Sequence, residues 1–187
     1  MVNMGVGVRL VKNDLKYAEQ VFELSSDPGV KDVLGIKVDH IDDTIGFISY
    51  IVQKELEGKV INRIILNEQD EVVGITTLKH IDRGDGICHM GTWIGVPFWG
   101  KGYNEASKIE ILKIAFNELK MDYVFAGAKE SNTRSRRAQE KLAYMTIGVE
   151  KEFPNEQIIV EQEAKTKCVL NVVKREEFSK FLTSHII

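Results

Sequence analysis

The sequence predicts an α+β fold built on one mixed, mostly antiparallel sheet. Apolar, β-branched runs at 60–66, 72–78 and 87–94 are separated by short polar turns, which is typical of consecutive antiparallel strands. An amphipathic helical segment at 103–119 then leads into a short apolar run at 123–128, and this strand–helix–strand order is typical of a parallel pair. One sheet that contains both kinds of connection indicates the α+β class.

The segments on either side add further strands and helices. The chain opens with an expected strand at 6–11, and Asn13 suits the N-cap of a helix that ends at Asp27-Pro28-Gly29. The other expected elements are helices at 42–57 and 133–142 and strands at 145–153 and 167–173. We therefore expect about six to seven strands flanked by about four to five helices.

One domain accounts for the whole chain. A length of 187 residues is that of a single domain, and no repeat, low-complexity stretch or Pro/Gly/Ser-rich linker divides it. We expect one domain over residues 1–187, with a core at about 6–175 and a C-terminal tail or helix at about 175–187. Hydrophobic residues make up 43% and charged residues 28%, which excludes a mainly disordered chain.

The charge and the cysteines exclude several classes of protein. A formal net charge of −3 gives no global attraction for nucleic acid or an anionic membrane, so neither is expected as a partner. Cys88 and Cys168 make no disulfide framework and no CxxC pair, and we interpret them as reduced thiols. No metal site is expected. Because no long apolar run and no signal peptide is visible, we expect a cytoplasmic protein.

A glycine-containing loop stands directly before the amphipathic helix at 103–119. Its residues are Gly100-Lys101-Gly102. The start of a helix presents unpaired N–H groups and the positive end of the helix dipole, and glycines let the backbone approach an anion closely. We interpret the segment as a phosphate-binding loop, with a glycine-rich turn that binds nothing as the alternative.

Two known nucleotide-binding patterns match this loop only in part. Gly95 to Lys101 matches G-x-x-x-x-G-K, but the next residue is Gly102 instead of the Ser or Thr that would hold Mg²⁺. The dinucleotide pattern G-x-G-x-x-G fails as well, because Tyr103, Asn104 and Glu105 follow with no third glycine.

The loop and its surroundings resemble a known enzyme family. Trp99-Gly-Lys-Gly-Tyr-Asn104 resembles the acetyl-CoA pyrophosphate loop of the GNAT acetyltransferase superfamily, whose usual form is (Gln/Arg)-x-x-Gly-x-(Gly/Ala). The longer segment Gly91–Tyr103 looks like the branch that contains the ribosomal-protein N-terminal acetyltransferases. Ser131–Tyr144 is similar to that branch's Asn-x-x-Ser-x-x-x-x-Glu-Lys-x-Gly-Phe, and Val8–Pro28 is similar to its opening strand and helix. The resemblance covers nearly the whole chain and implies a single GNAT-like domain.

The resemblance implies acetyl-CoA as co-substrate and assigns residues that bind it. In this family the pantetheine arm pairs with exposed strand backbone, which corresponds here to Thr92, Trp93 and Ile94. The amides that would hold the pyrophosphate belong to Gly100, Lys101, Gly102, Tyr103 and Asn104. Asn132 is implied to hydrogen-bond the pantetheine. The alternatives are core packing for Trp93 and Trp99 and a helix N-cap for Asn132.

Ser135 and His89 are the catalytic candidates that the resemblance indicates. Ser135 matches the branch's hydroxyl near the CoA sulfur and would protonate the leaving thiolate, while Gln139 stands where many members carry a Tyr. His89 occupies a strand position that often holds Glu, and it would take the proton from the amine. The alternatives are a surface serine, a structural histidine, and Glu130 or a water relay as the base.

The implied activity is direct transfer of an acetyl group from acetyl-CoA to a primary amine. The acceptor is a protein N-terminus, by resemblance to the ribosomal-protein branch, or a small amine. A non-catalytic acetyl-CoA-binding sensor or scaffold is the alternative. Edge strands also allow a homo-oligomer.

Two departures and one charged segment qualify the resemblance. Asn104 replaces the last Gly or Ala of the loop, so its side chain would crowd the pyrophosphate, and Ala143-Tyr144 replaces the usual Gly-Phe. The segment from Lys129 to Lys141 is basic, which indicates either a solvated helix face or steering of the CoA phosphates. In the second case Arg136 or Arg137 would contact the 3′-phosphate.

Overall fold

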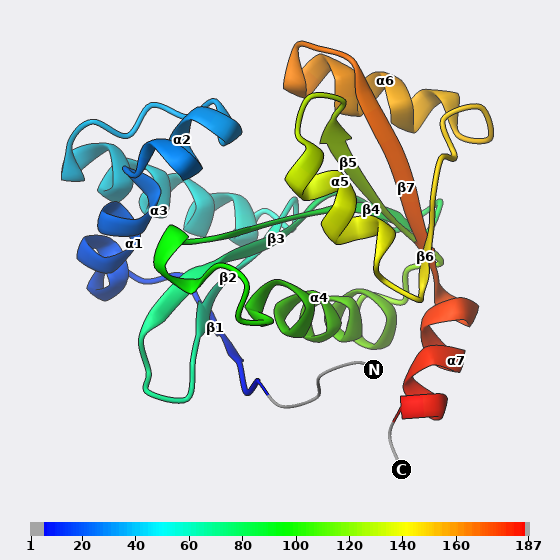
Figure 1. Cartoon of the computed structure of the whole chain (residues 1–187), viewed down its shortest axis with the longest axis horizontal. Coiled ribbons are helices and arrows are strands. Elements are labelled where there is room, and N and C mark those ends of the chain that lie inside the picture. The colour runs from blue at the N-terminus through cyan, green and yellow to red at the C-terminus, as the bar shows by residue number, and fades with distance from the viewer. Residues whose placement is uncertain (1–5, 186–187) are drawn as a thin grey trace. The chain divides into compact units, whose positions relative to one another are not determined.

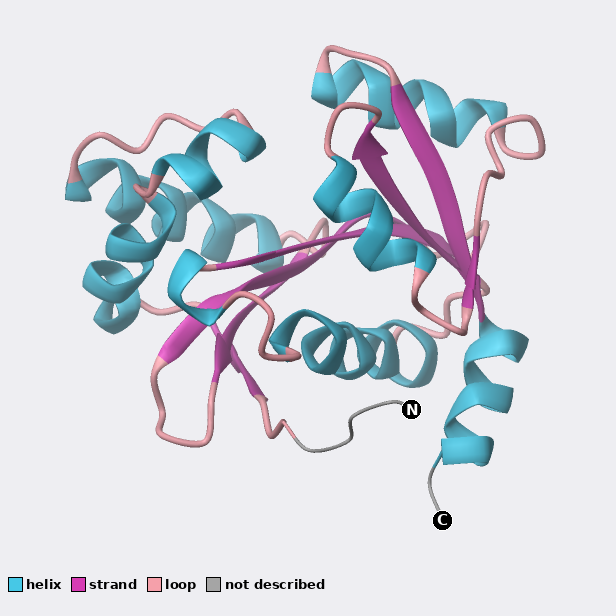
Figure 2. Cartoon of the chain, viewed as in Figure 1, coloured by secondary structure: helices cyan, strands magenta, loops and turns pink. Residues whose placement is uncertain are grey.

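The computed structural model describes residues 6–185, and seven strands and seven α-helices lie in this range. The strands are β1 (Arg9–Lys12), β2 (Ile61–Leu66), β3 (Val72–Asp82), β4 (Ile87–Ile94), β5 (Tyr123–Lys129), β6 (Met145–Thr146) and β7 (Cys168–Lys174) (Figure 1). The α-helices are α1 (Ala18–Ser25), α2 (Pro28–Leu34), α3 (Ile41–Leu56), α4 (Tyr103–Lys113), α5 (Thr133–Glu140), α6 (Pro154–Ala164) and α7 (Arg175–His185) (Figure 2). The short helical turns are η1 (Leu15–Tyr17), η2 (Val96–Phe98) and the π-helical η3 (Ile114–Glu118).

The strands form one sheet in the order β1-β2-β3-β4-β5-β7-β6. Strands β4 and β5 are parallel, with Ile87–His89 opposite Tyr123–Phe125. The pairs β1/β2, β2/β3, β5/β7 and β6/β7 are antiparallel. The predicted α+β fold with a mixed, mostly antiparallel sheet is therefore confirmed. The structure has more helices than expected, because α2 and α6 were not foreseen.

Helix α2 begins at the point where the sequence predicts only a helix end. Pro28 stands at the first helical position, where the missing N–H is harmless and the fixed φ suits a helix. Asp27 caps the helix, because its side chain accepts the N–H of Gly29 at 2.7 Å. Asp27-Pro28-Gly29 therefore starts a helix as well as following one.

The predicted strand at 145–153 is wrong beyond Thr146. Strand β6 ends there, and Gly148 has a φ of +72°, which takes the backbone out of the extended conformation. Pro154 then opens α6 in a segment to which the sequence analysis assigned no element.

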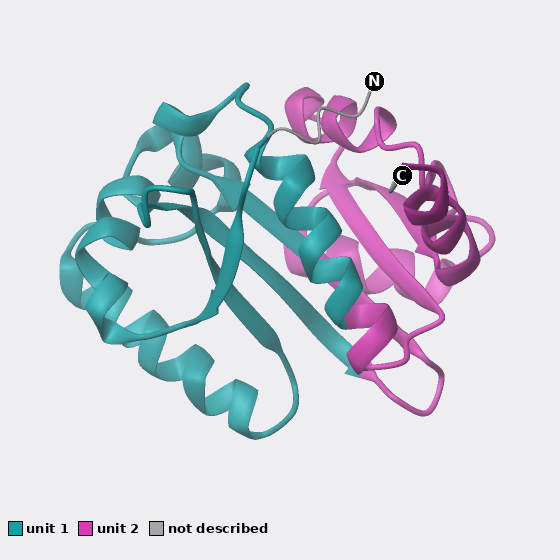
Figure 3. Ribbon diagram, turned by 90° about the horizontal axis from the view of Figure 1, so that it is seen from below, with its two compact units in different colours: residues 1–81, 91–114 teal, residues 82–90, 115–187 magenta. Residues whose placement is uncertain are grey.

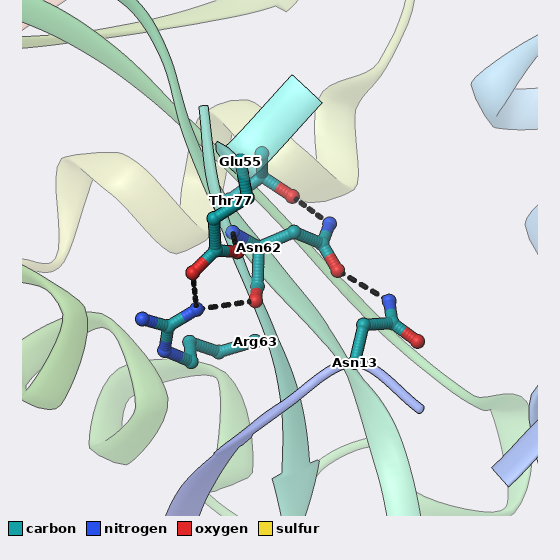
Figure 4. Close-up of polar contacts among 5 residues, drawn as sticks. All are labelled: Asn13, Glu55, Asn62, Arg63 and Thr77. Carbon is teal, nitrogen blue, oxygen red and sulfur yellow. Dashed lines mark hydrogen bonds and ion pairs between the residues drawn. The ribbon is translucent and has the colours of Figure 1, made fainter. Parts of the chain in front are cut away.

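Asn13 is not the N-cap that the sequence predicts. Asp14 caps η1 instead, and the Asn13 side chain is buried and donates to Asn62 Oδ1 at 2.6 Å. Asn62 in turn donates to Thr77 Oγ1 at 2.7 Å (Figure 4). Glu55 adds an acceptor for the backbone N–H of Asn62 at 3.2 Å, so polar side chains join β2, β3, α3 and the residue that follows β1.

The chain divides into two compact units (Figure 3). Unit 1 consists of residues 1–81 and 91–114, and unit 2 of residues 82–90 and 115–187. Strand β4 therefore contributes Gly91–Ile94 to unit 1 and its earlier residues to unit 2. The expectation of a single domain stays a prediction, and residues 1–5 and 186–187 lie outside the described range.

Unit 1 has apolar packing on both faces of its strands. Val21 of α1 packs with Ile64 in one buried cluster, whereas Trp99 and Tyr103 pack against the cluster that contains Ile65. Consecutive residues of β2 point to opposite faces because side chains alternate along a strand. Tyr103, the first residue of α4, therefore lies on the face of the strands opposite Val21.

Unit 2 is closed by helices α6 and α7. Val160 of α6 packs against a buried cluster that includes Phe125 and Leu170. Phe178 of α7 packs edge-on against Tyr144, with ring centroids 5.3 Å apart, so the expected C-terminal tail or helix is a helix up to His185.

Both cysteines are buried and free, and burial raises the pKa of the Cys88 thiol to about 12. Within residues 6–185, no helix has the length and apolar character that a membrane span requires.

Candidate active site

The loop before α4 adopts the conformation that only glycine takes easily. Gly100 has a φ of +72°, and Gly102, the N-cap of α4, has a φ of +89°. A Cβ added at Gly100 would meet no atom within 4 Å, so the space beside this residue is open. The backbone at this position is therefore accessible to a ligand.

The first turn of α4 supplies donors for an anion. The first α4 N–H with a backbone acceptor is that of Ala106, which donates to the Gly102 carbonyl at 3.1 Å. The N–H groups of Tyr103, Asn104 and Glu105 come before it and have no acceptor among residues 6–185. Such groups, at the positive end of the helix, fit a phosphate group.

Aromatic side chains fix the loop to unit 1. Trp99 donates its indole N–H to the Ile94 carbonyl at 2.7 Å, and Phe98 packs edge-on against Tyr103 with ring centroids 5.9 Å apart. Trp93 is half-buried against the cluster that contains Val21. Both indole rings therefore pack against the core, which was the alternative considered for Trp93 and Trp99.

The end of β4 lies in the same unit. Thr92 Oγ1 hydrogen-bonds Thr76 Oγ1 at 2.8 Å, and the N–H of Gly95 donates to the Val73 carbonyl at 2.9 Å. These contacts hold Thr92, Trp93 and Ile94 beside β3. Unit 1 thus contains the residues predicted to bind the pantetheine through their backbone and the pyrophosphate, whereas Asn132, Arg136 and Arg137 belong to unit 2.

Asn104 is turned toward a residue that the sequence analysis missed. Its side-chain oxygen accepts a hydrogen bond from the Nζ of Lys108, one helical turn further on. The Asn104 side chain therefore lies along α4, in the direction of Lys108. Lys108 is only 6% exposed, and burial lowers its pKa to about 8. The sequence signal was its spacing from Ile111 and Leu112, which places Lys108 on the apolar face of the helix.

Unit 2 contains Asn132, Ser135 and Gln139 in one hydrogen-bonded group. Asn132 is the N-cap of α5, since its side chain accepts the N–H of Ser135 at 3.1 Å. Gln139 donates to Ser135 Oγ at 3.4 Å and to the Gly127 carbonyl at 3.3 Å, and it accepts from Asn171 at 2.7 Å. The side chain that replaces the family's Tyr is therefore a buried hydrogen-bonding centre.

His89 is also in unit 2 and has an acidic partner. Its Nε2 lies 2.5 Å from Glu156 Oε2 in the first turn of α6, and its ring centroid lies 5.3 Å from that of Phe125. His89 is 3% exposed. Glu156 was not predicted as a site residue, because no helix was expected where α6 lies.

The other polar candidates are more exposed. Glu130 is exposed, and its backbone carbonyl accepts from Arg136 Nη1 at 3.1 Å. Arg137 is exposed on α5. Burial lowers the pKa of Arg134, the third arginine of this helix.

The whole pattern agrees with a known family. A family model described as the acetyltransferase (GNAT) domain matches residues 8–145. The chain belongs to the GNAT acetyltransferase family. The resemblance predicted from the loop is confirmed, and so is the assignment as an acetyltransferase enzyme.

Individual GNAT proteins are similar to this chain. The "Uncharacterized N-acetyltransferase p20" of Bacillus licheniformis is 27% identical over 147 residues, which is 77% of this chain and 82% of that protein. The "Putative ribosomal N-acetyltransferase YdaF" of Bacillus subtilis is 29% identical over 75 residues, 40% of this chain and 41% of that protein.

A solved GNAT structure has the same fold. The microcin C7 self-immunity acetyltransferase MccE, in complex with acetyl-CoA and AMP, superposes with a TM-score of 0.69 at 17% identity, covering 89% of this chain and 90% of that chain. The GNAT fold predicted for this chain is therefore confirmed.

Proposed function

We propose that this GNAT enzyme transfers the acetyl group of acetyl-CoA to a primary amine, either a protein N-terminus or a small amine. The observation that carries the proposal is the loop at Gly100–Gly102, with its open backbone and the unpaired N–H groups of the first turn of α4. Acetyl-CoA fits this donor set because its pyrophosphate is an anion.

Acetyl-CoA, when bound, supplies a thioester whose acetyl group an unprotonated amine accepts. The amides of Gly100 to Asn104 bind and orient the pyrophosphate, and the backbone of Thr92, Trp93 and Ile94 aligns the pantetheine arm. Asn132 adds a side-chain contact to that arm. MccE supports this reading, since its structure contains acetyl-CoA on the same fold.

His89 and Glu156 are suited to take the proton of the acceptor ammonium. Glu156 Oε2 lies 2.5 Å from His89 Nε2, and this contact holds the imidazole ring in one orientation. Glu156 is a positioning residue in this scheme, because it acts through His89.

Ser135 is suited to supply a proton to the sulfur when the carbon–sulfur bond breaks. Gln139 donates to Ser135 Oγ, which leaves the hydroxyl proton to be directed to another acceptor. The amine nitrogen bonds to the acetyl carbon as the carbon–sulfur bond breaks. His89 would take the first proton from the ammonium, and Ser135 would give its hydroxyl proton to the leaving sulfur. The second proton of the attacking nitrogen then returns to Ser135 Oγ through solvent and restores the hydroxyl.

We consider two classes of acceptor amine. The ribosomal N-acetyltransferase named among them supports a protein N-terminus, and the resemblance to the ribosomal-protein branch points the same way. A small amine is the second candidate. A cytoplasmic location, the absence of a metal and self-association stay predictions from the sequence.

A pair of matched glycine substitutions tests the loop. Gly100 and Gly58 have φ angles of +72° and +73°, and neither added Cβ would meet an atom within 4 Å. Gly100→Ala and Gly58→Ala therefore carry the same backbone strain, but only the first places a methyl group beside the proposed pyrophosphate. Gly102 is less suitable, because its Cβ would lie 3.3 Å from Val6.

Calorimetry with acetyl-CoA and a thiol-release assay over a panel of amines and peptides provide the readouts. We expect Gly100→Ala to weaken acetyl-CoA binding by about tenfold or more, since it displaces the anion from its donors, and Gly58→Ala to bind like the wild type. Equal affinities for the two variants would contradict the loop assignment. Binding without amine-dependent thiol release would favour the non-catalytic sensor.

A further inference from the structure

Lys108 carries a charge in a place that does not favour one. Its ammonium is buried, and its hydrogen-bond partner is the neutral side-chain amide of Asn104. No carboxylate of residues 6–185 forms an ion pair with it. Burial lowers its pKa to about 8, although the negative charge of Glu105 acts in the opposite direction.

The ammonium also lies at the positive end of a helix. Side chains of an α-helix point back toward its N-terminus, and the bond to Asn104 brings the Lys108 Nζ level with the first turn of α4. A cation at this end of a helix is opposed by the dipole. An amide oxygen stabilises an ammonium by one hydrogen bond but does not neutralise it. Within residues 6–185 the ammonium therefore has no ion-pair partner, and Glu105 acts on it only as a nearby charge.

We propose that Lys108 is the buried countercharge of the pyrophosphate held by the loop, and that Asn104 positions its ammonium. The proposal rests on acetyl-CoA as the co-substrate. Asn104 departs from the usual loop sequence, and the proposal gives its side chain a function of its own, in addition to that of its backbone N–H. The anion stabilises the charged form of Lys108, so acetyl-CoA binding takes up a proton at pH values where Lys108 is partly neutral.

Other charged side chains lie on α4, on the loop before it and on β1, and their effects can be distinguished from that of Lys108. Glu105 lies on the same helix, and Lys101 in the loop stands 5.5 Å above the Phe98 ring. On β1, which packs against α4, Lys12 shares the side of Leu10 and is exposed. Acetyl-CoA itself has no free thiol to titrate. Proton uptake near pH 8 is therefore assigned by substitution of Lys108.

The experiment measures acetyl-CoA binding by calorimetry in two buffers of different ionisation enthalpy. At pH 8 we expect the full-length wild type to take up about half a proton per site, because Lys108 is then half charged. Lys108→Met should abolish the uptake and weaken binding at pH 7 by about tenfold, the effect of one pKa unit of charge interaction. Lys113→Met is the matched control on the same helix, since Lys113 is partly exposed and paired with Glu110, and it should match the wild type.

A second variant and a second ligand sharpen the test. Asn104→Ala removes the acceptor of the ammonium, so the pH midpoint of proton uptake should move lower. Lys108→Met should weaken the binding of acetyl-(3′-dephospho)-CoA by the same factor as that of acetyl-CoA, because both ligands contain the pyrophosphate. A loss seen only with the 3′-phosphate present would overturn the assignment to the pyrophosphate.

Different results would overturn the role of Lys108 and the use of acetyl-CoA as co-substrate. Unchanged affinity and proton uptake in both Lys108→Met and Asn104→Ala would overturn the role of Lys108 while leaving acetyl-CoA as the co-substrate. No binding of acetyl-CoA to the wild type would overturn the proposed function itself.

Discussion

His89 Nε2 and Glu156 Oε2 lie 2.5 Å apart, joining β4 to the first turn of α6. Both side chains are largely buried, at 3% and 12% exposure. A buried carboxylate and imidazole in contact stabilise each other, and removing one leaves the other without its partner. The pair is thus either a structural connection or a proton acceptor held in one orientation, and the two interpretations predict different kinetics.

Substituting Glu156 distinguishes these interpretations. Glu156→Gln keeps an acceptor oxygen for Nε2 but removes the charge, so we expect kcat to fall by about tenfold to a hundredfold with little change in acetyl-CoA affinity. Glu152→Gln is the control, because Glu152 is exposed and pairs loosely with Lys174 at 3.8 Å. Steady-state kinetics and calorimetry measure the two quantities. A wild-type kcat in a folded Glu156→Gln variant would make the pair structural.

Ser135 should affect turnover more than binding. Ser135→Ala removes the hydroxyl that Gln139 orients, while Gln139 keeps its bonds to Gly127 and Asn171. We expect kcat to fall by about a hundredfold, as for loss of a general acid, and the Kd for acetyl-CoA to stay close to that of the wild type. Ser184→Ala, on the exposed surface of α7, serves as the hydroxyl control. Equal turnover would assign the thiolate proton to water.

Gly127 is required by the close approach of α6 to β5. A Cβ added there would collide with Val160 Cγ1, so Gly127→Ala should lower the free energy of unfolding by about 1–3 kcal/mol. Gly46→Ala in the middle of α3 is the opposite case, because its Cβ would meet nothing within 4 Å. That change should raise the free energy of unfolding by about 1 kcal/mol. Urea denaturation measures both, and a shift of the same sign in the two variants would contradict the packing argument.

Lys108 should reduce the stability of the ligand-free protein. Its pKa is lowered from 10.5 in the unfolded chain to about 8 in the folded one, so between these pH values the unfolded chain binds the extra proton. The free energy of unfolding therefore rises with pH from about 8 to 10.5, and below pH 8 the full penalty remains. Lys108→Met removes a penalty of about 3 kcal/mol at pH 7.

Denaturation at several pH values checks this sign. Without ligand, Lys108→Met should be more stable than the wild type at pH 7, and the difference should shrink as the pH approaches 10.5. Lys108→Met would then gain stability and lose acetyl-CoA affinity. This trade-off is expected when a buried charge destabilises the free protein but contributes to ligand binding. A destabilised variant at pH 7 would mean that the ammonium is stabilised in the free protein.

Much of the fold was predictable because its signals are local. The strand at 87–94 was predicted with the bounds that β4 has, since alternating apolar residues and a polar turn mark it. The α2 helix was missed although its signals are local too, because Asp27-Pro28 is common both after a helix and at the start of one. The α6 helix was missed because its apolar residues have no clear helical period.

The sequence by itself determined the fold class, most of the strands, the glycine loop before α4 and, through that loop, the GNAT family. These depend on neighbours a few residues apart, where backbone preference and side-chain period decide the outcome. Only the tertiary structure decided the partners of the site residues: Glu156 for His89 across 67 positions, and Asn171 for Gln139 across 32. It also showed that Lys108 is buried, because burial depends on which helix face meets the sheet. The contacts of Glu156 and Asn171 arise when distant segments pack together, and no local pattern encodes them.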